Sequence, residues 1–138
     1  MDVVEFRTAH YDELSQFWRD YGWCPPSEEV LPKKGFVAVT NGKAVGASFV
    51  YLSESGMAFM DWVIADPNAS ALSRGKAVYK TVEACQEYAR SQGKKVLYTV
   101  TANAALLGTY EAMGFEKMET EATTMAMSLD GTKTDFLR

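Results

Sequence analysis

The sequence predicts an α/β protein, a single domain with a mixed sheet and the element order β-α-α-β-β-β-α-β-α-β-β. An Asn-Gly pair at 41–42 joins two apolar, strand-like runs, which is typical of a β-hairpin. Residues 73–91 carry apolar side chains at a period near 3.6, which indicates a helix. Strand-like runs at 57–64 and 95–100 flank this helix, so the three elements form a βαβ unit.

The N-terminal segment is predicted to hold one strand, one helix and a loop. Residues 3–7 form the strand, and the apolar side chains after it recur at helical spacing: Leu14, Phe17, Trp18 and Tyr21. Gly22 is placed to end this helix, because glycine readily adopts the positive φ of a helix C-terminus. Residues 23–35 contain three of the four prolines and are predicted to be a loop, in which Ser27 caps one short helical turn.

The next segment is predicted to be an antiparallel meander. Strands 36–40 and 43–52 pair through the Asn-Gly turn, which tolerates the positive φ angles of a type I′ turn. A second turn at 53–56 leads into strand 57–64. Residues 65–67, Ala-Asp-Pro, end that strand, because the residue before a proline is restricted in conformation.

The C-terminal half is predicted to continue with alternating elements. Strand 95–100 follows helix 73–91, and a second helix covers 103–113. Gly114 stands where this helix should end. Two final strands are expected, at 115–119 and 123–129.

Length and charge exclude several classes of protein. A chain of 138 residues suits one domain, here 1–130, followed by a polar tail at 131–138. The 14 basic and 18 acidic side chains give a net charge of 14 − 18 = −4, whereas nucleic-acid binding needs a basic surface. No stretch reaches the roughly 18 apolar residues of a membrane span, and the N-terminus lacks the pattern of a secretory signal. We therefore expect a cytoplasmic protein with no nucleic-acid and no membrane partner.

Residues for metal or thiol chemistry are scarce. The chain has one histidine, His10, and two cysteines, Cys24 and Cys85, with no spacing that suits zinc. Two cysteines are too few for a disulfide framework. Cys85 falls on the apolar stripe of helix 73–91, which indicates a core residue. No metal site is expected.

The segment 103–115 carries the most specific pattern in the chain. Asn103, Tyr110, Gly114 and Phe115 fit the spacing Asn-x-x-Ala-x-x-x-Tyr-x-x-x-Gly-Phe, from which Leu106 departs. On this pattern the chain resembles the GCN5-related N-acetyltransferase (GNAT) family over residues 3–129. The resemblance implies that Asn103 helps to hold coenzyme A and that Tyr110 protonates the departing thiolate, which suits a weak acid. Alternatively, Asn103 only caps a helix and Tyr110 only packs in the core.

A second, weaker match opens helix 73–91. The family has Gln/Arg-x-x-Gly-x-Gly/Ala, whose backbone amides bind a pyrophosphate at a helix start. Leu72 stands where Gln or Arg is usual, and the preceding loop is longer than usual, so the pyrophosphate-binding loop is degenerate. The resemblance implies that four residues bind the pyrophosphate: Arg74, Gly75, Lys76 and Ala77. The alternative is a plain helix start capped by Ser73.

Strand 57–64 completes the expected site. In the family a bulge splays this strand from the next, so the resemblance implies that the N–H groups near Val63 and Ile64 hold the cofactor arm and polarise the acetyl carbonyl. The accepting amine must be neutral, which calls for a carboxylate as general base. Asp61 is the first candidate, and desolvation beside Trp62 would raise its pKa. Glu54 in the preceding turn is the second; for either, the alternative is a surface carboxylate.

The resemblance implies an N-acetyltransferase that uses acetyl-CoA (coenzyme A). The acceptor, a small-molecule or protein amine, attacks the thioester directly in a ternary complex, and a homodimer through the last strands is plausible for this family. Three aromatic residues either line the acceptor pocket or belong to the core: Trp18, Tyr21 and Trp23. The alternative function is a GNAT-fold binding or structural protein without catalytic activity, encoded by a virus or mobile element and part of a larger assembly. Leu72 and the longer loop motivate that alternative.

Overall fold

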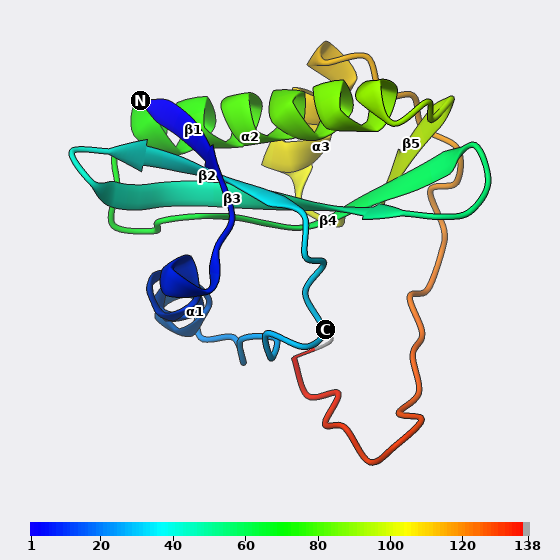
Figure 1. Cartoon of the computed structure of the whole chain (residues 1–138), viewed down its shortest axis with the longest axis horizontal. Coiled ribbons are helices and arrows are strands. Elements are labelled where there is room, and N and C mark those ends of the chain that lie inside the picture. Colours follow the sequence, from blue (N-terminus) through cyan, green and yellow to red (C-terminus); the bar gives the residue numbers. More distant parts are fainter. Residues whose placement is uncertain (137–138) are drawn as a thin grey trace. The chain divides into compact units, whose positions relative to one another are not determined.

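Five strands form one mixed sheet in the computed structural model, which describes residues 1–136. The strands are β1 (Asp2–Glu5), β2 (Gly35–Thr40), β3 (Lys43–Leu52), β4 (Met57–Ala65) and β5 (Val96–Thr99). They lie in the order β1-β2-β3-β4-β5, with β1 to β4 antiparallel and β5 parallel to β4 (Figure 1). The sheet lies within the first of two compact units, Met1–Val100, and the second unit is Thr101–Arg138.

Two helices cover the two faces of this sheet (Figure 1). A 3₁₀ turn, η1 (Thr8–His10), leads into α1 (Tyr11–Asp20), whose Leu14, Phe17 and Trp18 pack with Phe49 of β3 in a buried cluster. On the opposite face, α2 (Ala71–Ser91) packs Ala77 against Ala38 and Val45. Ser48 and Thr81 satisfy each other there by a buried hydrogen bond of 2.8 Å between their hydroxyls. The sequence therefore predicted the mixed sheet and its two main helices correctly.

The tight hairpin is confirmed. Asn41 and Gly42 have φ angles of 52° and 75°, as a type I′ turn requires, and Thr40 pairs with Lys43.

The predicted helical turn after Ser27 is not a helix. Val30 and Leu31 only donate their amides to the carbonyls three residues earlier, which gives two overlapping turns.

Helix α2 begins two residues earlier than the sequence predicted. Its N-cap is Ser70, whose hydroxyl accepts the amide of Ser73 over 3.1 Å. The predicted cap at Ser73 is therefore wrong, because either serine satisfies the capping pattern and the chain uses the first. As a result, Arg74, Gly75 and Lys76 lie in the opening turns of the helix and not in a loop.

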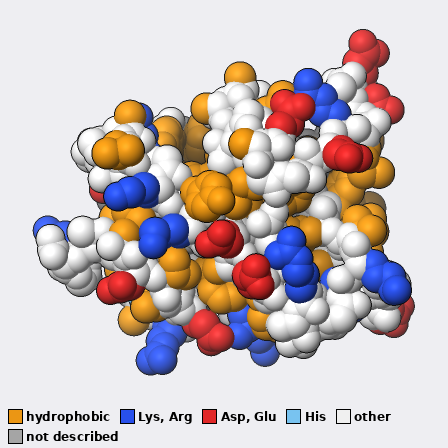
Figure 2. All heavy atoms as spheres, turned by 90° about the horizontal axis from the view of Figure 1, so that it is seen from above, with side chains coloured by type: hydrophobic (Ala, Val, Ile, Leu, Met, Phe, Trp, Pro, Cys, Tyr) orange, Lys and Arg blue, Asp and Glu red, His pale blue; other side chains and the backbone are white. Residues whose placement is uncertain are grey.

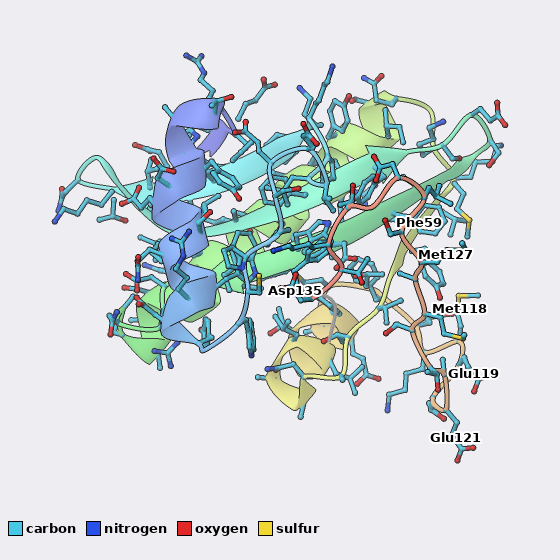
Figure 3. The ribbon with its side chains drawn as sticks, turned by 90° about the horizontal axis from the view of Figure 1, so that it is seen from below. Phe59, Met118, Glu119, Glu121, Met127 and Asp135 are labelled. Atoms are coloured by element: carbon cyan, nitrogen blue, oxygen red, sulfur yellow. The ribbon has the colours of Figure 1, made fainter. Side chains whose placement is uncertain are left out.

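The second unit holds helix α3 (Ala104–Ala112) and an extended segment after it. The two strands predicted at 115–119 and 123–129 are absent, since no described residue after α3 joins a ladder. In the second of them Met125, Met127 and Leu129 stand at alternate positions, but these side chains are exposed. Met118 of the first is exposed as well, and Figure 3 shows Met118 and Met127 on the extended segment. A period of two marks a strand only where a neighbouring strand supplies the hydrogen bonds.

Neither a metal centre nor a membrane helix is found in residues 1–136. No three His, Cys, Asp or Glu side chains there gather in a way that could hold a metal ion. None of the helices in this range is both long enough and apolar enough to cross a membrane.

Candidate active site

A β-bulge interrupts β4 at Trp62. Ala47 of β3 pairs with Ile64, whereas Phe49 pairs with Asp61, so two steps along β3 match three steps along β4. Trp62 takes up the extra residue with a φ of +57°, a conformation that costs on the order of 1–3 kcal/mol outside glycine. Pairing between β4 and β5 ends just before the bulge, at Met60 and Thr99. The bulge that the resemblance implied is therefore present, and the part of β4 beyond it has no partner in β5.

The amides beyond the bulge point to alternate edges of β4. Asp66 donates its N–H to the Val45 carbonyl of β3 over 2.7 Å. Because successive N–H groups of a strand alternate in direction, the amide of Ile64 also faces β3, and that of Val63 faces the opposite edge. Of the two predicted arm-binding residues, Val63 is therefore the one whose N–H faces away from β3. It lies beyond Met60, the last residue of β4 that pairs with β5.

Asp61 lies on the α1 face of the sheet, since its register partner Phe49 packs against α1. Its carboxylate accepts the backbone N–H of Trp62 over 2.8 Å. Burial raises the pKa of Asp61, and the Trp62 hydrogen bond lowers it by less. The residue as a whole still counts as exposed by surface area, so a proton can reach the carboxyl from solvent. A carboxylate with a raised pKa and solvent access suits a general base.

Tyr51 of β3 completes a cluster with Asp61 and Trp62. Trp62 Nε1–H donates to the Tyr51 hydroxyl over 2.7 Å, and that hydroxyl donates to the Val30 carbonyl over 3.1 Å. Burial raises the pKa of Tyr51, and the Asp61 charge raises it further, although the Trp62 bond lowers it. The phenol therefore stays protonated at neutral pH. Sequence reasoning missed Tyr51; the signal was its place two residues from Phe49, on the same face of β3.

Glu54, the second candidate base, lies away from this cluster. It is exposed in the turn between β3 and β4. From Phe49, the register partner of Asp61, to the end of β3 at Leu52 is about 10 Å of strand, and Glu54 lies beyond it. The two candidate carboxylates are not brought together.

The start of α2 offers backbone amides and one exposed basic side chain. The first amides of a helix have no partner four residues earlier, and here the N-cap Ser70 engages those of Ser73 and Arg74. The Arg74 guanidinium folds back onto the preceding loop, where it donates to the carbonyls of Ala69 and Pro67 over 2.6 and 3.4 Å. Lys76 is exposed, whereas Ala77 is fully buried.

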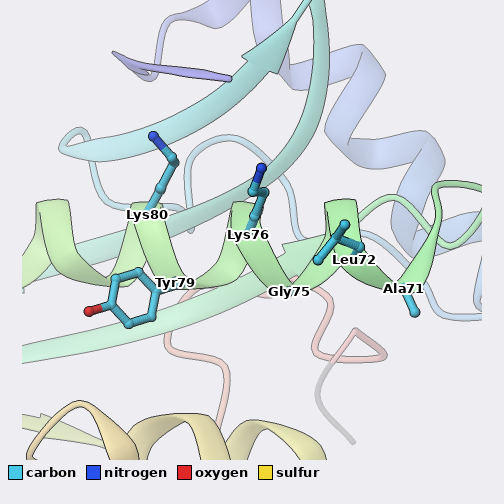
Figure 4. A pocket seen from close by; sticks show the side chains of 6 residues that line it. All are labelled: Ala71, Leu72, Gly75, Lys76, Tyr79 and Lys80. Atoms are coloured by element: carbon cyan, nitrogen blue, oxygen red, sulfur yellow. The ribbon is translucent and has the colours of Figure 1, made fainter.

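Gly75 faces an open hollow on α2. The hollow has a volume of about 460 Å³, and Figure 4 shows its lining residues: Ala71, Leu72, Gly75, Lys76, Tyr79 and Lys80. A Cβ built on Gly75 would meet no other atom within 4 Å, so protein packing does not require glycine here. The lining includes two basic side chains, Lys76 and Lys80, and no acidic one. Figure 2 shows acidic and basic side chains together on the face as a whole.

In the second unit, the predicted motif shapes both ends of α3. Asn103 is the N-cap, and its side chain accepts the Leu106 amide over 3.0 Å. The role of Asn103 in holding coenzyme A stays a prediction. Tyr110 is buried at 3 % exposure, with its ring centroid 5.3 Å from that of Phe115. Gly114 has a φ of +100°, which allows Phe115 N–H to reach the Tyr110 carbonyl over 3.0 Å.

The aromatic residues near the first loop divide between core and surface. Trp18 is 5 % exposed and belongs to the α1 cluster. Tyr21 and Trp23 are 39 % and 41 % exposed, and their rings stack with centroids 4.7 Å apart. The core interpretation is therefore confirmed for Trp18, and for Tyr21 and Trp23 the acceptor-pocket interpretation stays a prediction.

Comparison with known proteins gives one family match and many similar folds. Residues 3–115 match the model of the acetyltransferase (GNAT) family. No curated protein sequence matches the chain. The aminoglycoside N-acetyltransferase AAC(6')-Iy in complex with CoA is similar in structure, with a TM-score of 0.67, 16% identity and coverage of 92% of this chain and 100% of that one.

Two further solved structures resemble the chain to the same degree. Rv2747 from Mycobacterium tuberculosis, in complex with CoA and NLQ, has a TM-score of 0.67 and 18% identity, covering 90% of this chain and 76% of its own. The ribosomal-protein-S18-alanine N-acetyltransferase from Escherichia coli has a TM-score of 0.69 and 18% identity, covering 86% and 79%. At these identities the likeness shows the fold.

Proposed function

Because the chain belongs to the acetyltransferase (GNAT) family, we propose that it transfers an acetyl group from acetyl-CoA to a primary amine. The observation that carries this proposal is the bulge of β4, with Asp61 and Trp62 on one side and the Val63 amide on the edge that β5 has left. Family membership favours this enzyme over a binding or structural protein without activity.

The coenzyme A moiety would be held by α2 and the edge of β4. Gly75 supports this assignment, since a glycine that packing does not require leaves room for phosphate oxygens to approach the backbone. Lys76 would add an exposed positive charge beside it. Arg74 would act by fixing the loop before α2. Ala77 would act by packing the helix onto the sheet, because its side chain is buried and its N–H lies beyond the unpaired amides of the helix start.

On the β4 edge we assign the arm-binding amide to Val63 in preference to Ile64, whose N–H faces β3 by strand alternation. The resemblance assigns Asn103 to coenzyme A binding. It would contribute by ordering the start of α3, where it is the N-cap. Acetyl-CoA supplies the activated acetyl group, and these residues hold it for attack.

The chain's own groups would manage the protons of the transfer. Asp61 removes one proton from the ammonium form of the acceptor, whose nitrogen lone pair then forms the bond to the acetyl carbon as the carbon–sulfur bond breaks. Asp61 would release this proton to solvent and then take the second proton from the nitrogen, which also passes to solvent. Tyr110 would give a proton to the departing thiolate and regain one from solvent. The Val63 N–H stabilises the negative charge that develops on the carbonyl oxygen. Glu54 is kept as a secondary candidate base only.

The acceptor is an amine of a small molecule or of a protein. Structural neighbours include an enzyme of each kind, one named for aminoglycosides and one for the alanine of a ribosomal protein. Direct attack in a ternary complex fits the presence of a candidate base, Asp61. Of the two cysteines, Cys85 is fully buried in α2, and Cys24 is not among the residues assigned to the site.

The test is a thiol-release assay with acetyl-CoA and a panel of amines that includes aminoglycosides and peptides with free N-termini. We expect amine-dependent release that falls sharply in Asp61→Asn and Tyr110→Phe. Release that never exceeds the rate without enzyme, across the panel, would contradict the proposal.

A further inference from the structure

Trp62 adopts a backbone conformation that a bulky residue rarely takes in a strand. Its φ of +57° is shared, among the described non-glycine residues, only by Asn41, which sits in a tight turn that favours asparagine. Such a conformation persists only where surrounding contacts hold it. The contacts of Trp62 therefore identify what keeps the β4 bulge in place.

Tyr51 reaches Trp62 from the neighbouring strand. Its hydroxyl accepts the indole N–H of Trp62 over 2.7 Å and donates to the carbonyl of Val30 over 3.1 Å. One oxygen thus connects the bulge of β4 to the loop between α1 and β2. Removing this oxygen would cost both bonds at once, at a half-buried position where water replaces them poorly.

We propose that Tyr51 is a positioning residue: its hydroxyl clamps the Trp62 indole and thereby fixes the bulge that sets the β4 edge at Val63. The inference rests on the proposed function, in which this edge binds acetyl-CoA. Tyr51 acts through Trp62 and is not itself assigned to the reacting atoms.

The protonation of Tyr51 agrees with this role. A phenolate could accept the Trp62 N–H but could not donate to Val30. Burial and the adjacent Asp61 charge raise the pKa of Tyr51, so the hydroxyl keeps its proton and serves both partners.

Tyr11 provides a matched control within the same chain. Its hydroxyl donates to the carbonyl of Pro26 over 2.6 Å, so it anchors the same loop that Tyr51 anchors at Val30. Tyr11→Phe removes a loop anchor and leaves the bond between Tyr51 and Trp62 in place. The two substitutions therefore separate anchoring of the loop from clamping of the bulge.

The experiment combines NMR of the indole N–H groups with calorimetry of acetyl-CoA binding to the whole chain. The three tryptophans give three indole signals, and Trp62→Phe identifies one of them by its loss. We expect Tyr51→Phe to move the Trp62 signal upfield and to weaken acetyl-CoA binding about tenfold. Tyr11→Phe should change neither.

A double-mutant cycle tests whether the two side chains act together. Trp62→Phe keeps an aromatic ring and removes the N–H, so it should weaken acetyl-CoA binding to the same degree as Tyr51→Phe. The double variant should bind no worse than either single variant. If Tyr51→Phe fails to fold, Trp62→Phe carries the same comparison against Tyr11→Phe.

The possible results separate the inference from the function on which it rests. Unchanged affinity in folded Tyr51→Phe, or equal losses in Tyr51→Phe and Tyr11→Phe, overturns the inference and leaves the proposed function standing. A folded, unsubstituted protein that does not bind acetyl-CoA overturns the proposed function, and the inference falls with it.

Discussion

At the scale of single residues, Asp61 is held in surroundings that favour its neutral form. Burial raises the pKa of its carboxyl above the ordinary 3.8, and the single bond from the Trp62 amide compensates for only part of this rise. A base of this kind binds a proton more strongly than an exposed aspartate does. The same burial should therefore affect the pH dependence of activity and the stability of the fold.

Asp61→Asn removes the base and keeps an oxygen that can accept the Trp62 amide. We expect the rate of acetyl transfer to fall about a hundredfold or more, the usual effect of losing a general base. In the unsubstituted enzyme, the rate should rise with pH through the raised pKa of Asp61, at higher pH than for an exposed aspartate. A pH–rate profile of both proteins checks this, with Glu54→Gln as a control that should keep most activity.

The same substitution should stabilise the fold at neutral pH. The folded-state pKa of Asp61 lies above the unfolded value, so the folded state binds the proton more tightly. Stability is then lost as pH rises from the unfolded pKa through the folded one. Asp61→Asn should therefore raise the Tm at pH 7 and change it less near pH 3. A lower Tm at pH 7 would show that the carboxylate stabilises the fold.

The two cysteines should differ strongly in reactivity. Burial raises the pKa of the Cys85 thiol to about 12, and its side chain is fully buried, whereas Cys24 is partly accessible in a loop. Since the thiolate is the reactive form, a thiol reagent should modify Cys24 in the native protein and Cys85 only after unfolding. Mass spectrometry after brief labelling checks the order, and rapid native labelling of Cys85 would contradict the buried position.

Residues whose roles depend on local pattern could be predicted from the sequence. Asp61 was found because it lies in an apolar strand beside Trp62. Tyr51 was not, because its partners lie 11 and 21 residues away in sequence, and only the β3–β4 register and the fold of the first loop bring them together. Arg74 was predicted to bind the pyrophosphate, but its guanidinium donates a hydrogen bond to the Ala69 carbonyl in the loop before α2.

At the scale of elements, Gly75 weakens helix α2, in whose second turn it lies. Glycine in a helix costs roughly 0.5–1 kcal/mol relative to alanine, and no atom within 4 Å would clash with a Cβ there. Gly75→Ala should therefore stabilise the fold by about that amount and weaken acetyl-CoA binding, because the methyl group would occupy the approach to the backbone. Denaturant unfolding and calorimetry check the two effects.

Gly108 in α3 is the matched control, since its Cβ would also meet no atom within 4 Å. Gly108→Ala should bring a similar gain in stability and no loss of affinity. If Gly75→Ala binds acetyl-CoA as tightly as the unsubstituted protein, the assignment of Gly75 is wrong.

Elements with a self-contained signal were predicted well, and those that need a distant partner were not. The Asn41-Gly42 hairpin is specified by its own turn chemistry. The start of α2 was placed two residues late because Ser70 and Ser73 are equivalent caps in sequence. The strands expected at 115–119 and 123–129 are absent because a strand requires a ladder, which residues 1–136 do not supply there.

At the scale of the whole molecule, the net charge of −4 opposes an anionic ligand unless positive groups gather locally. The α2 face mixes both signs, and Arg74 is engaged by its own loop, so Lys76 and the first amides of α2 carry most of the expected attraction. Binding of acetyl-CoA should therefore depend moderately on salt and largely on backbone contacts along α2 and β4.

Calorimetric titration of the unsubstituted protein with acetyl-CoA measures binding at the proposed site without any knowledge of the acceptor. We expect saturable binding at one site per chain, with a dissociation constant well below about 1 mM. A folded protein that shows no binding heat and no thermal shift at millimolar acetyl-CoA would contradict it.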